Sequence, residues 1–172
     1  MNSASSRMFH HSGSEVMKMH HLGRTAGTLT AILLSVSVST AEAAELPVTS
    51  SFGWRTHPIT GEQKFHTGLD LGYPSGTQVP SMFDGVVVQA GDFSDGYGNQ
   101  VLVYHPSLDC YTRYAHLSSV AVDVDVWLVQ GSCIGFVGET GNATGPHLHL
   151  EYIVRGADGN FVFNDPLSLW AI

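Results

Sequence analysis

Two short motifs carry the side chains that could do chemistry in this sequence. The first is an H-x-H pair formed by His147 and His149, and the second is an H-x-x-x-D pair formed by His66 and Asp70. Imidazole nitrogens and carboxylate oxygens are common zinc ligands. An H-x-H pair alone is a weak signal, because such pairs occur by chance, but the two motifs together predict a metal site.

The number of candidate side chains matches a catalytic zinc site, which has three protein ligands and one open position for water or substrate. His66, Asp70 and one histidine of the H-x-H pair supply three ligands. His116 and the remaining histidine of that pair could then act as acid–base groups, because imidazole titrates near neutral pH. Strand spacing alone leaves open whether His147 or His149 binds the metal.

Bound zinc would lower the pKa of a water molecule to about 7 and would polarise a carbonyl group. That chemistry is metal-assisted hydrolysis of a bond such as a peptide.

Short β-type runs separated by turn clusters must position these side chains. The expected strands are residues 86–88, 100–104, 111–116, 134–137 and 147–154. No window shows a convincing helical period, so the sequence predicts an all-β fold, mainly antiparallel. Within the last strand, alternation would place His147 and His149 on one face, and Leu148 and Leu150 on the other.

The segment that joins His66 to Asp70 is also expected to be extended. Gly68, Gly72 and Pro74 disfavour a helix there. An extended segment still brings residues four apart to one face.

Other reactive side chains are expected to lie outside the site. His57 and His105 each precede a proline, which predicts surface turn residues. Cys110 and Cys133 could form a disulfide in an oxidising compartment or remain as buried free thiols, and both alternatives stay open.

The N-terminal residues differ from the rest of the chain. Lys18 and Arg24 precede an uncharged apolar run, residues 28–38, and Ala41 and Ala43 have the spacing of a cleavage site. This pattern predicts an N-terminal extension and signal peptide over residues 1–43, a mature domain over 44–172, and export to the periplasm or to the extracellular space or cell wall. The run is shorter than the ~20 residues that span a bilayer. No stable membrane span is therefore expected after cleavage, with an uncleaved anchor as the alternative.

The charge balance restricts the partners. The chain has 15 acidic and 7 basic side chains and a formal net charge of −8. A nucleic-acid partner would require a basic patch, so none is expected.

Six segments form a recognisable series in sequence order. They are residues 52–58 (FGWRTHP), 66–70 (HTGLD), 84–87 (DGVV), 96–99 (GYGN), 113–118 (RYAHLS) and 140–151 (TGNATGPHLHLE). In their order and spacing they resemble the lysostaphin/LytM-type zinc peptidoglycan endopeptidases, over about residues 50–167.

The resemblance implies a duplicated-hybrid-motif β core with a zinc-containing groove. It makes His66, Asp70 and His149 the metal ligands, and His116 and His147 the catalytic pair. The implied partners are the stem peptides of bacterial cell-wall peptidoglycan, whose crosslinks would be hydrolysed. The alternative is a catalytically inactive LytM-like module that activates a cell-wall amidase. Such modules generally lack the zinc ligands, whereas all five site residues are kept here.

Overall fold

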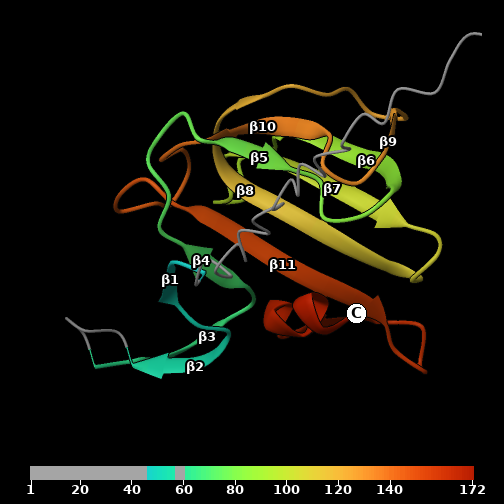
Figure 1. The fold of residues 1–172 in the computed structure, drawn as a ribbon. Coiled ribbons are helices and arrows are strands. Elements are labelled where there is room, and N and C mark those ends of the chain that lie inside the picture. Colours follow the sequence, from blue (N-terminus) through green and yellow to red (C-terminus); the bar gives the residue numbers. More distant parts are fainter. Residues whose placement is uncertain (1–45, 57–60) are drawn as a thin grey trace, which may run out of the picture. The chain divides into compact units, whose positions relative to one another are not determined.

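The fold is built from antiparallel strands (Figure 1), as the sequence predicts. The computed structural model describes residues 46–56 and 61–172, all within the unit Glu42–Ile172. Its elements are β1 (Val48–Ser50), β2 (Gly53–Thr56), β3 (Gln63–His66), β4 (Leu69–Leu71), β5 (Gln78–Pro80), β6 (Gly85–Asp92), β7 (Asn99–His105), β8 (Cys110–Val120), β9 (Trp127–Leu128), β10 (Cys133–Val137), β11 (Leu148–Arg155), β12 (Phe161–Asn164) and the 3-10 helix η1 (Pro166–Ala171).

One large sheet carries most of these strands. Its main path runs β1-β4-β11-β8-β7-β6-β9, with β10 paired to β5 and β8, and β12 paired to β11. Strands β2 and β3 form a separate two-stranded sheet. In Figure 1 the long strands β11 and β8 run side by side through the large sheet. The five predicted strands lie within β6, β7, β8, β10 and β11 or overlap their ends.

The predicted alternation on β11 is confirmed. Leu148 and Leu150 are 6% and 1% exposed and belong to the hydrophobic core, together with residues of neighbouring strands such as Val101 and Tyr114. Replacing a buried leucine of this kind with alanine costs about 2–5 kcal/mol of stability. The core therefore fixes the orientation of β11 and turns His149, which lies between the two leucines, away from the apolar side.

The prediction for His105 was wrong, because this residue is fully buried at the end of β7. Its Nδ1 lies 2.9 Å from the Asp84 carbonyl oxygen and its Nε2 lies 2.7 Å from Thr112 Oγ1. A buried imidazole is stable when both nitrogens have partners. Pro106 follows the strand, but it does not bring His105 to the surface. His57 lies outside the described residues.

The two cysteines are free thiols. Cys110 is buried at the start of β8, and Cys133 is partly buried at the start of β10. The disulfide alternative is therefore not realised in this structure.

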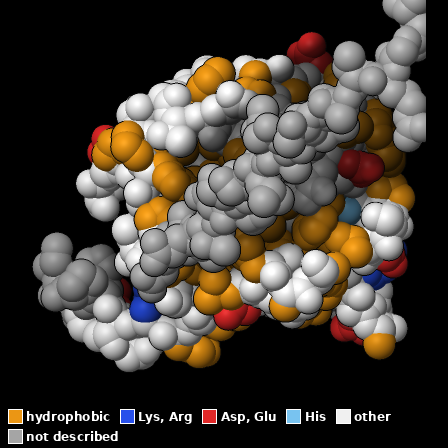
Figure 2. Space-filling model, in the orientation of Figure 1, with side chains coloured by type: hydrophobic (Ala, Val, Ile, Leu, Met, Phe, Trp, Pro, Cys, Tyr) orange, Lys and Arg blue, Asp and Glu red, His pale blue; other side chains and the backbone are white. Residues whose placement is uncertain are grey.

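The predicted extension and signal peptide lie outside the described residues. No helix in the described part of the chain is long and apolar enough to cross a bilayer. On the face drawn in Figure 2, hydrophobic side chains are widespread and Lys and Arg are sparse, which agrees with the acidic composition.

Candidate active site

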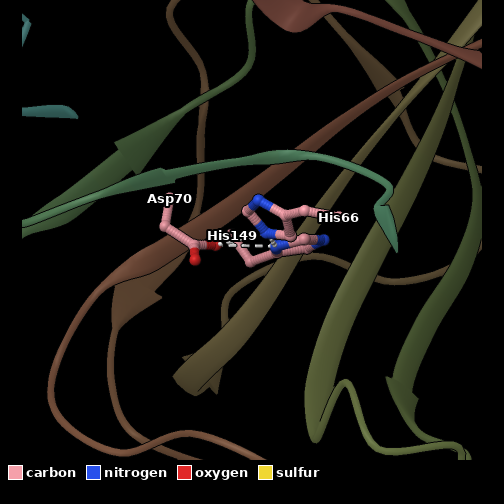
Figure 3. Close-up of side chains that lie close together, drawn as sticks. All are labelled: His66, Asp70 and His149. Atoms are coloured by element: carbon pink, nitrogen blue, oxygen red, sulfur yellow. Dashed lines mark hydrogen bonds and ion pairs between the residues drawn. The ribbon is translucent and has the colours of Figure 1, made fainter. Parts of the chain in front are cut away.

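Three strands bring the predicted metal ligands together. His149 on β11 stands in register with Asp70 on β4 and with Ala115 on β8. His66 is the last residue of β3, just before the chain enters β4. Figure 3 shows the side chains of His66, Asp70 and His149 pointing toward one another.

The distances among these side chains suit a small metal ion. His149 Nδ1 and Asp70 Oδ1 are 2.8 Å apart, and His66 Nε2 lies 3.1 Å from the same oxygen and 3.2 Å from His149 Nδ1. Zinc held by such ligands at ~2.0–2.2 Å in a tetrahedron would separate the ligand atoms by about 3.3 Å. Two imidazoles and a carboxylate therefore fit zinc in both chemistry and spacing.

The carboxyl group of Asp70 is ionised in this setting. Burial alone would raise its pKa, but hydrogen bonds and charge interactions with His149 and His66 outweigh burial, and the pKa falls far below its ordinary value. The pKa of His149 is raised: burial lowers it, but Asp70 and Glu151 outweigh that effect. The pocket thus offers a negative ligand for a cation.

Gly68 permits this close approach. A Cβ atom at this position would lie 2.4 Å from the Leu150 carbonyl oxygen and 2.8 Å from the His149 ring. No side chain fits there without displacing β11, so the glycine between His66 and Asp70 is required by packing.

Backbone carbonyl groups orient three of the histidine rings. Nδ1 of His66, His116 and His147 each lies 2.8 Å from a carbonyl oxygen, of Ser51, Thr140 and Gly145 respectively. A carbonyl accepts only, so each Nδ1 carries the proton and each Nε2 is left as the basic nitrogen. In this tautomer Nε2 of each of the three rings is free to bind a metal or to accept a proton.

His116 and His147 lie beside the ligand set. Their ring centroids are 4.7 Å apart, the His116 and His149 centroids are 5.7 Å apart, and His147 Nε2 is 3.7 Å from Asp70 Oδ1. Burial lowers the pKa of His116 despite its bond to the Thr140 carbonyl. His116 is therefore a neutral base at neutral pH.

The backbone of His116 is unusual. Its φ is +60°, in the left-handed region that residues other than glycine seldom adopt. Here β8 changes partners, since Ala115 pairs with β11 and Leu117 pairs with β10. The His116 N–H instead donates to the Tyr97 carbonyl at 2.9 Å. Strained backbone of this kind is often found at functional sites.

A buried carboxylate contacts His149 on the nitrogen that faces away from Asp70. Glu151 is fully buried, and its Oε1 lies 3.4 Å from His149 Nε2. Thr67 Oγ1 and Tyr97 OH each donate to the same oxygen at 2.6 Å, and Arg113 Nη1 donates to Oε2 at 2.9 Å. Sequence reasoning missed this network. The signal was present in the alternation, because residues 147, 149 and 151 share one face of the strand.

All five predicted site residues line one cleft of about 780 Å³. The hairpin β2–β3 adds Arg55, Lys64 and Phe65 to its lining. The loops before β7 and β11 add Tyr97 and Asn142, and these loops are joined by a hydrogen bond from Asn142 N to the Gly96 carbonyl oxygen. The arrangement combines an anionic metal pocket with basic imidazoles, as metal-assisted hydrolysis requires.

Comparison with known proteins identifies the family. The model of peptidase family M23 matches residues 64–161, which is more than half of the chain and includes all five site residues. The chain belongs to peptidase family M23. The resemblance to lysostaphin-type enzymes is thereby confirmed.

Solved M23 structures share the fold. The catalytic domain of lysostaphin from Staphylococcus simulans is 29% identical with a TM-score of 0.65, and the match covers 74% of this chain and 93% of that one. A zinc-containing peptidase from Vibrio cholerae is 37% identical with a TM-score of 0.59, over 67% of this chain and 35% of that one.

Curated M23 relatives are more similar in sequence. The DD-carboxypeptidase/endopeptidase Mpg of Neisseria meningitidis is 42% identical over 66% of this chain and 26% of its own length. The peptidoglycan DD-endopeptidase ShyA of Vibrio cholerae is 42% identical over 62% of this chain and 24% of its own length. The match thus spans about a quarter of the length of these relatives.

Proposed function

We propose that this protein is a zinc metalloendopeptidase that hydrolyses the peptide crosslinks of bacterial cell-wall peptidoglycan. The observation that carries the proposal is the convergence of His66, Asp70 and His149 beside His116 and His147 in one cleft. Membership of family M23 supports the same reaction class. The inactive-activator alternative has no observation in its favour, because the site residues are all present.

The proposed ligands are His66 through Nε2, Asp70 through a carboxylate oxygen and His149 through Nδ1. Bound zinc would supply Lewis acidity that activates water and polarises the scissile carbonyl group. Donors of this type and number leave one position open for water or substrate.

His116 and His147 are the proposed catalytic residues. Each presents Nε2 as its basic nitrogen, because its Nδ1–H is held by a backbone carbonyl. One ring accepts the proton of the attacking water and returns it to the leaving amine. The other ring takes up a proton from solvent at Nε2, donates that N–H to the carbonyl oxygen as negative charge develops there, and keeps the proton when the carbonyl group re-forms.

The proposed bond is the one between D-alanine and the next D-centre of a crosslink. The support is the similarity to the proteins named DD-endopeptidase and DD-carboxypeptidase/endopeptidase, each 42% identical over its matched region. The substrate lies outside the cytoplasm, so the proposed location is the periplasm or cell wall, in line with the predicted signal peptide.

Two variants test the assignment. His149→Ala should lose both zinc and hydrolysis, whereas His116→Ala should keep zinc and lose hydrolysis. Zinc is measured by atomic absorption, and hydrolysis by mass spectrometry of fragments released from purified sacculi. A fully active His116→Ala protein would contradict the catalytic assignment. Wild-type protein that cannot be loaded with zinc, and that stimulates an amidase instead, would favour the activator.

A further inference from the structure

Basic side chains are scarce in the mature region, and their positions are uneven. The four that follow residue 43 are Arg55, Lys64, Arg113 and Arg155. Arg113 is bound to the buried Glu151. Arg155, at the end of β11, stacks on the Phe161 ring at 5.4 Å. Of these four residues, Arg55 and Lys64 alone line the cleft.

Arg55 and Lys64 form one cationic pair. They are directly opposite each other in the register of β2 and β3, and residues in such positions place their side chains on the same face of the ribbon. Half of the mature region's basic residues therefore meet at the cleft of an acidic protein.

Arg55 is held beside the metal pocket without being buried. Its Nη1 donates to Ser50 Oγ at 2.6 Å and lies 3.7 Å from Asp70 Oδ2. The Arg55 side chain remains 44% exposed, against 13% for Asp70. A guanidinium group has five donors in a planar fork that matches a carboxylate. Part of that fork is available to a molecule in the cleft.

The substrate proposed above carries a carboxylate at the matching place. In a crosslink from D-alanine to a D-centre, the residue on the amine side of the scissile bond ends in a free α-carboxylate. That group is three bonds from the scissile carbonyl carbon, and therefore within about 4 Å of it. In the interior of a glycine bridge, an amide occupies this position instead.

We infer that Arg55, assisted by Lys64, binds the free carboxylate next to the scissile bond and thereby selects D-alanyl crosslinks over uncharged bridges. The inference rests on the proposed function and adds the group that recognises the substrate. Arg55 supplies hydrogen bonds and charge at short range. Lys64 adds to the local positive potential, and solvent weakens its contribution because it is exposed.

The test crosses protein variants with paired substrates. Two synthetic peptides contain the D-alanyl bond to the D-centre of diaminopimelate, one with the adjacent carboxylate free and one with it amidated. The zinc-loaded proteins are wild type, Arg55→Gln, Arg55→Lys and Lys64→Gln. Arg155→Gln is the matched control, because it removes the same charge outside the cleft. Each protein is checked for zinc content and for its circular dichroism spectrum.

Wild type should cleave the free carboxylate peptide with kcat/KM about 10- to 100-fold above that of the amide, the range expected for hydrogen bonds to a charged group. Arg55→Gln should lose that preference, because its kcat/KM should fall for the free-carboxylate peptide and stay unchanged for the amidated peptide. Arg55→Lys should keep part of the preference for the free carboxylate. Lys64→Gln should lose less of this preference than Arg55→Gln does. Arg155→Gln should match wild type on both peptides.

Two results would overturn the inference. One is wild-type protein that cleaves both peptides equally well. The other is an Arg55→Gln protein that loses activity equally on both peptides and binds zinc less tightly, since Arg55 would then serve only to hold Asp70. If zinc-loaded wild type cleaves neither these peptides nor sacculi, the proposed function itself fails, and the inference fails with it.

Discussion

Glu151 Oε1 lies 3.4 Å from Nε2 of His149, on the side of the ring away from the metal pocket. The other nitrogen, Nδ1, faces Asp70 at 2.8 Å. A carboxylate that accepts from Nε2–H leaves the lone pair on Nδ1, so Glu151 selects the tautomer that can bind a metal. The pKa of Glu151 is lowered: burial opposes this, but His149, Thr67, Tyr97 and Arg113 prevail.

Glu151→Gln should therefore weaken zinc binding. We expect the dissociation constant to rise about 10- to 100-fold, as for other partners of metal-binding histidines. Competition with a chromogenic chelator measures it. Glu139→Gln is the matched control, because Glu139 is exposed. Equal zinc affinities for the two variants would show that Glu151 does not support the ligand.

Gly68→Ala should disturb both the fold and the metal pocket. The added Cβ would overlap the Leu150 carbonyl and the His149 ring, so the free energy of unfolding should fall by about 1–3 kcal/mol. Zinc affinity should fall with it. Gly145→Ala is the control, because a Cβ there meets nothing within 4 Å. Urea denaturation and chelator competition should separate the two alanine variants, and identical behaviour would refute this packing argument.

His105 should make stability depend on pH. Burial lowers its pKa in the folded state below the ordinary value of 6.5, against the opposing bond to the Asp84 carbonyl. Above pH 6.5 both states are neutral at this residue and no stability is lost. Below pH 6.5 the unfolded chain binds a proton that the folded chain resists, so stability falls.

Urea denaturation at pH 7.5 and 5.5 tests this for wild type and His105→Gln. The variant should be less stable at pH 7.5, because a buried network is broken, but it should lose less stability on acidification. An equal loss in both proteins would contradict the role of His105.

The two thiols should react at different rates. Burial, with the nearby Asp109, raises the pKa of Cys110 to about 11. Cys133 is only partly buried. Iodoacetamide at pH 8 should therefore modify Cys133 first, and both residues after unfolding, as peptide mass spectrometry would show. Equal rates in the folded protein, or an absence of free thiols, would contradict the structure.

Local patterns in the sequence predicted β8 and β11, the strands that bear His116 and His149, because β-branched and alternating runs are local signals. They did not predict β1 to β5 as strands, since each is only three or four residues long. Two of them, β4 and β5, are fixed by pairing with the distant strands β11 and β10. The burial of His105 was missed for the same reason, because its partners Asp84 and Thr112 come from other parts of the chain.

Spacing and alternation in the sequence grouped more of the candidate site residues than of the strands. The four-residue spacing predicted that His66 and Asp70 share one face, and strand alternation predicted the same for His147 and His149. Alternation could not rank those two histidines. In the structure His149 Nδ1 is 2.8 Å from Asp70 Oδ1, and His147 Nε2 is 3.7 Å from it. That difference supports the ligand role for His149, which the family resemblance implies.

The left-handed backbone of His116 has a consequence for protein engineering. A residue with a side chain costs roughly 1–2 kcal/mol in that conformation, and glycine avoids this cost. Selection for heat resistance alone would therefore favour glycine at position 116 and discard the imidazole. A library of this protein selected for stability alone would therefore lose the proposed catalytic group at position 116, so each round should also be screened for hydrolysis.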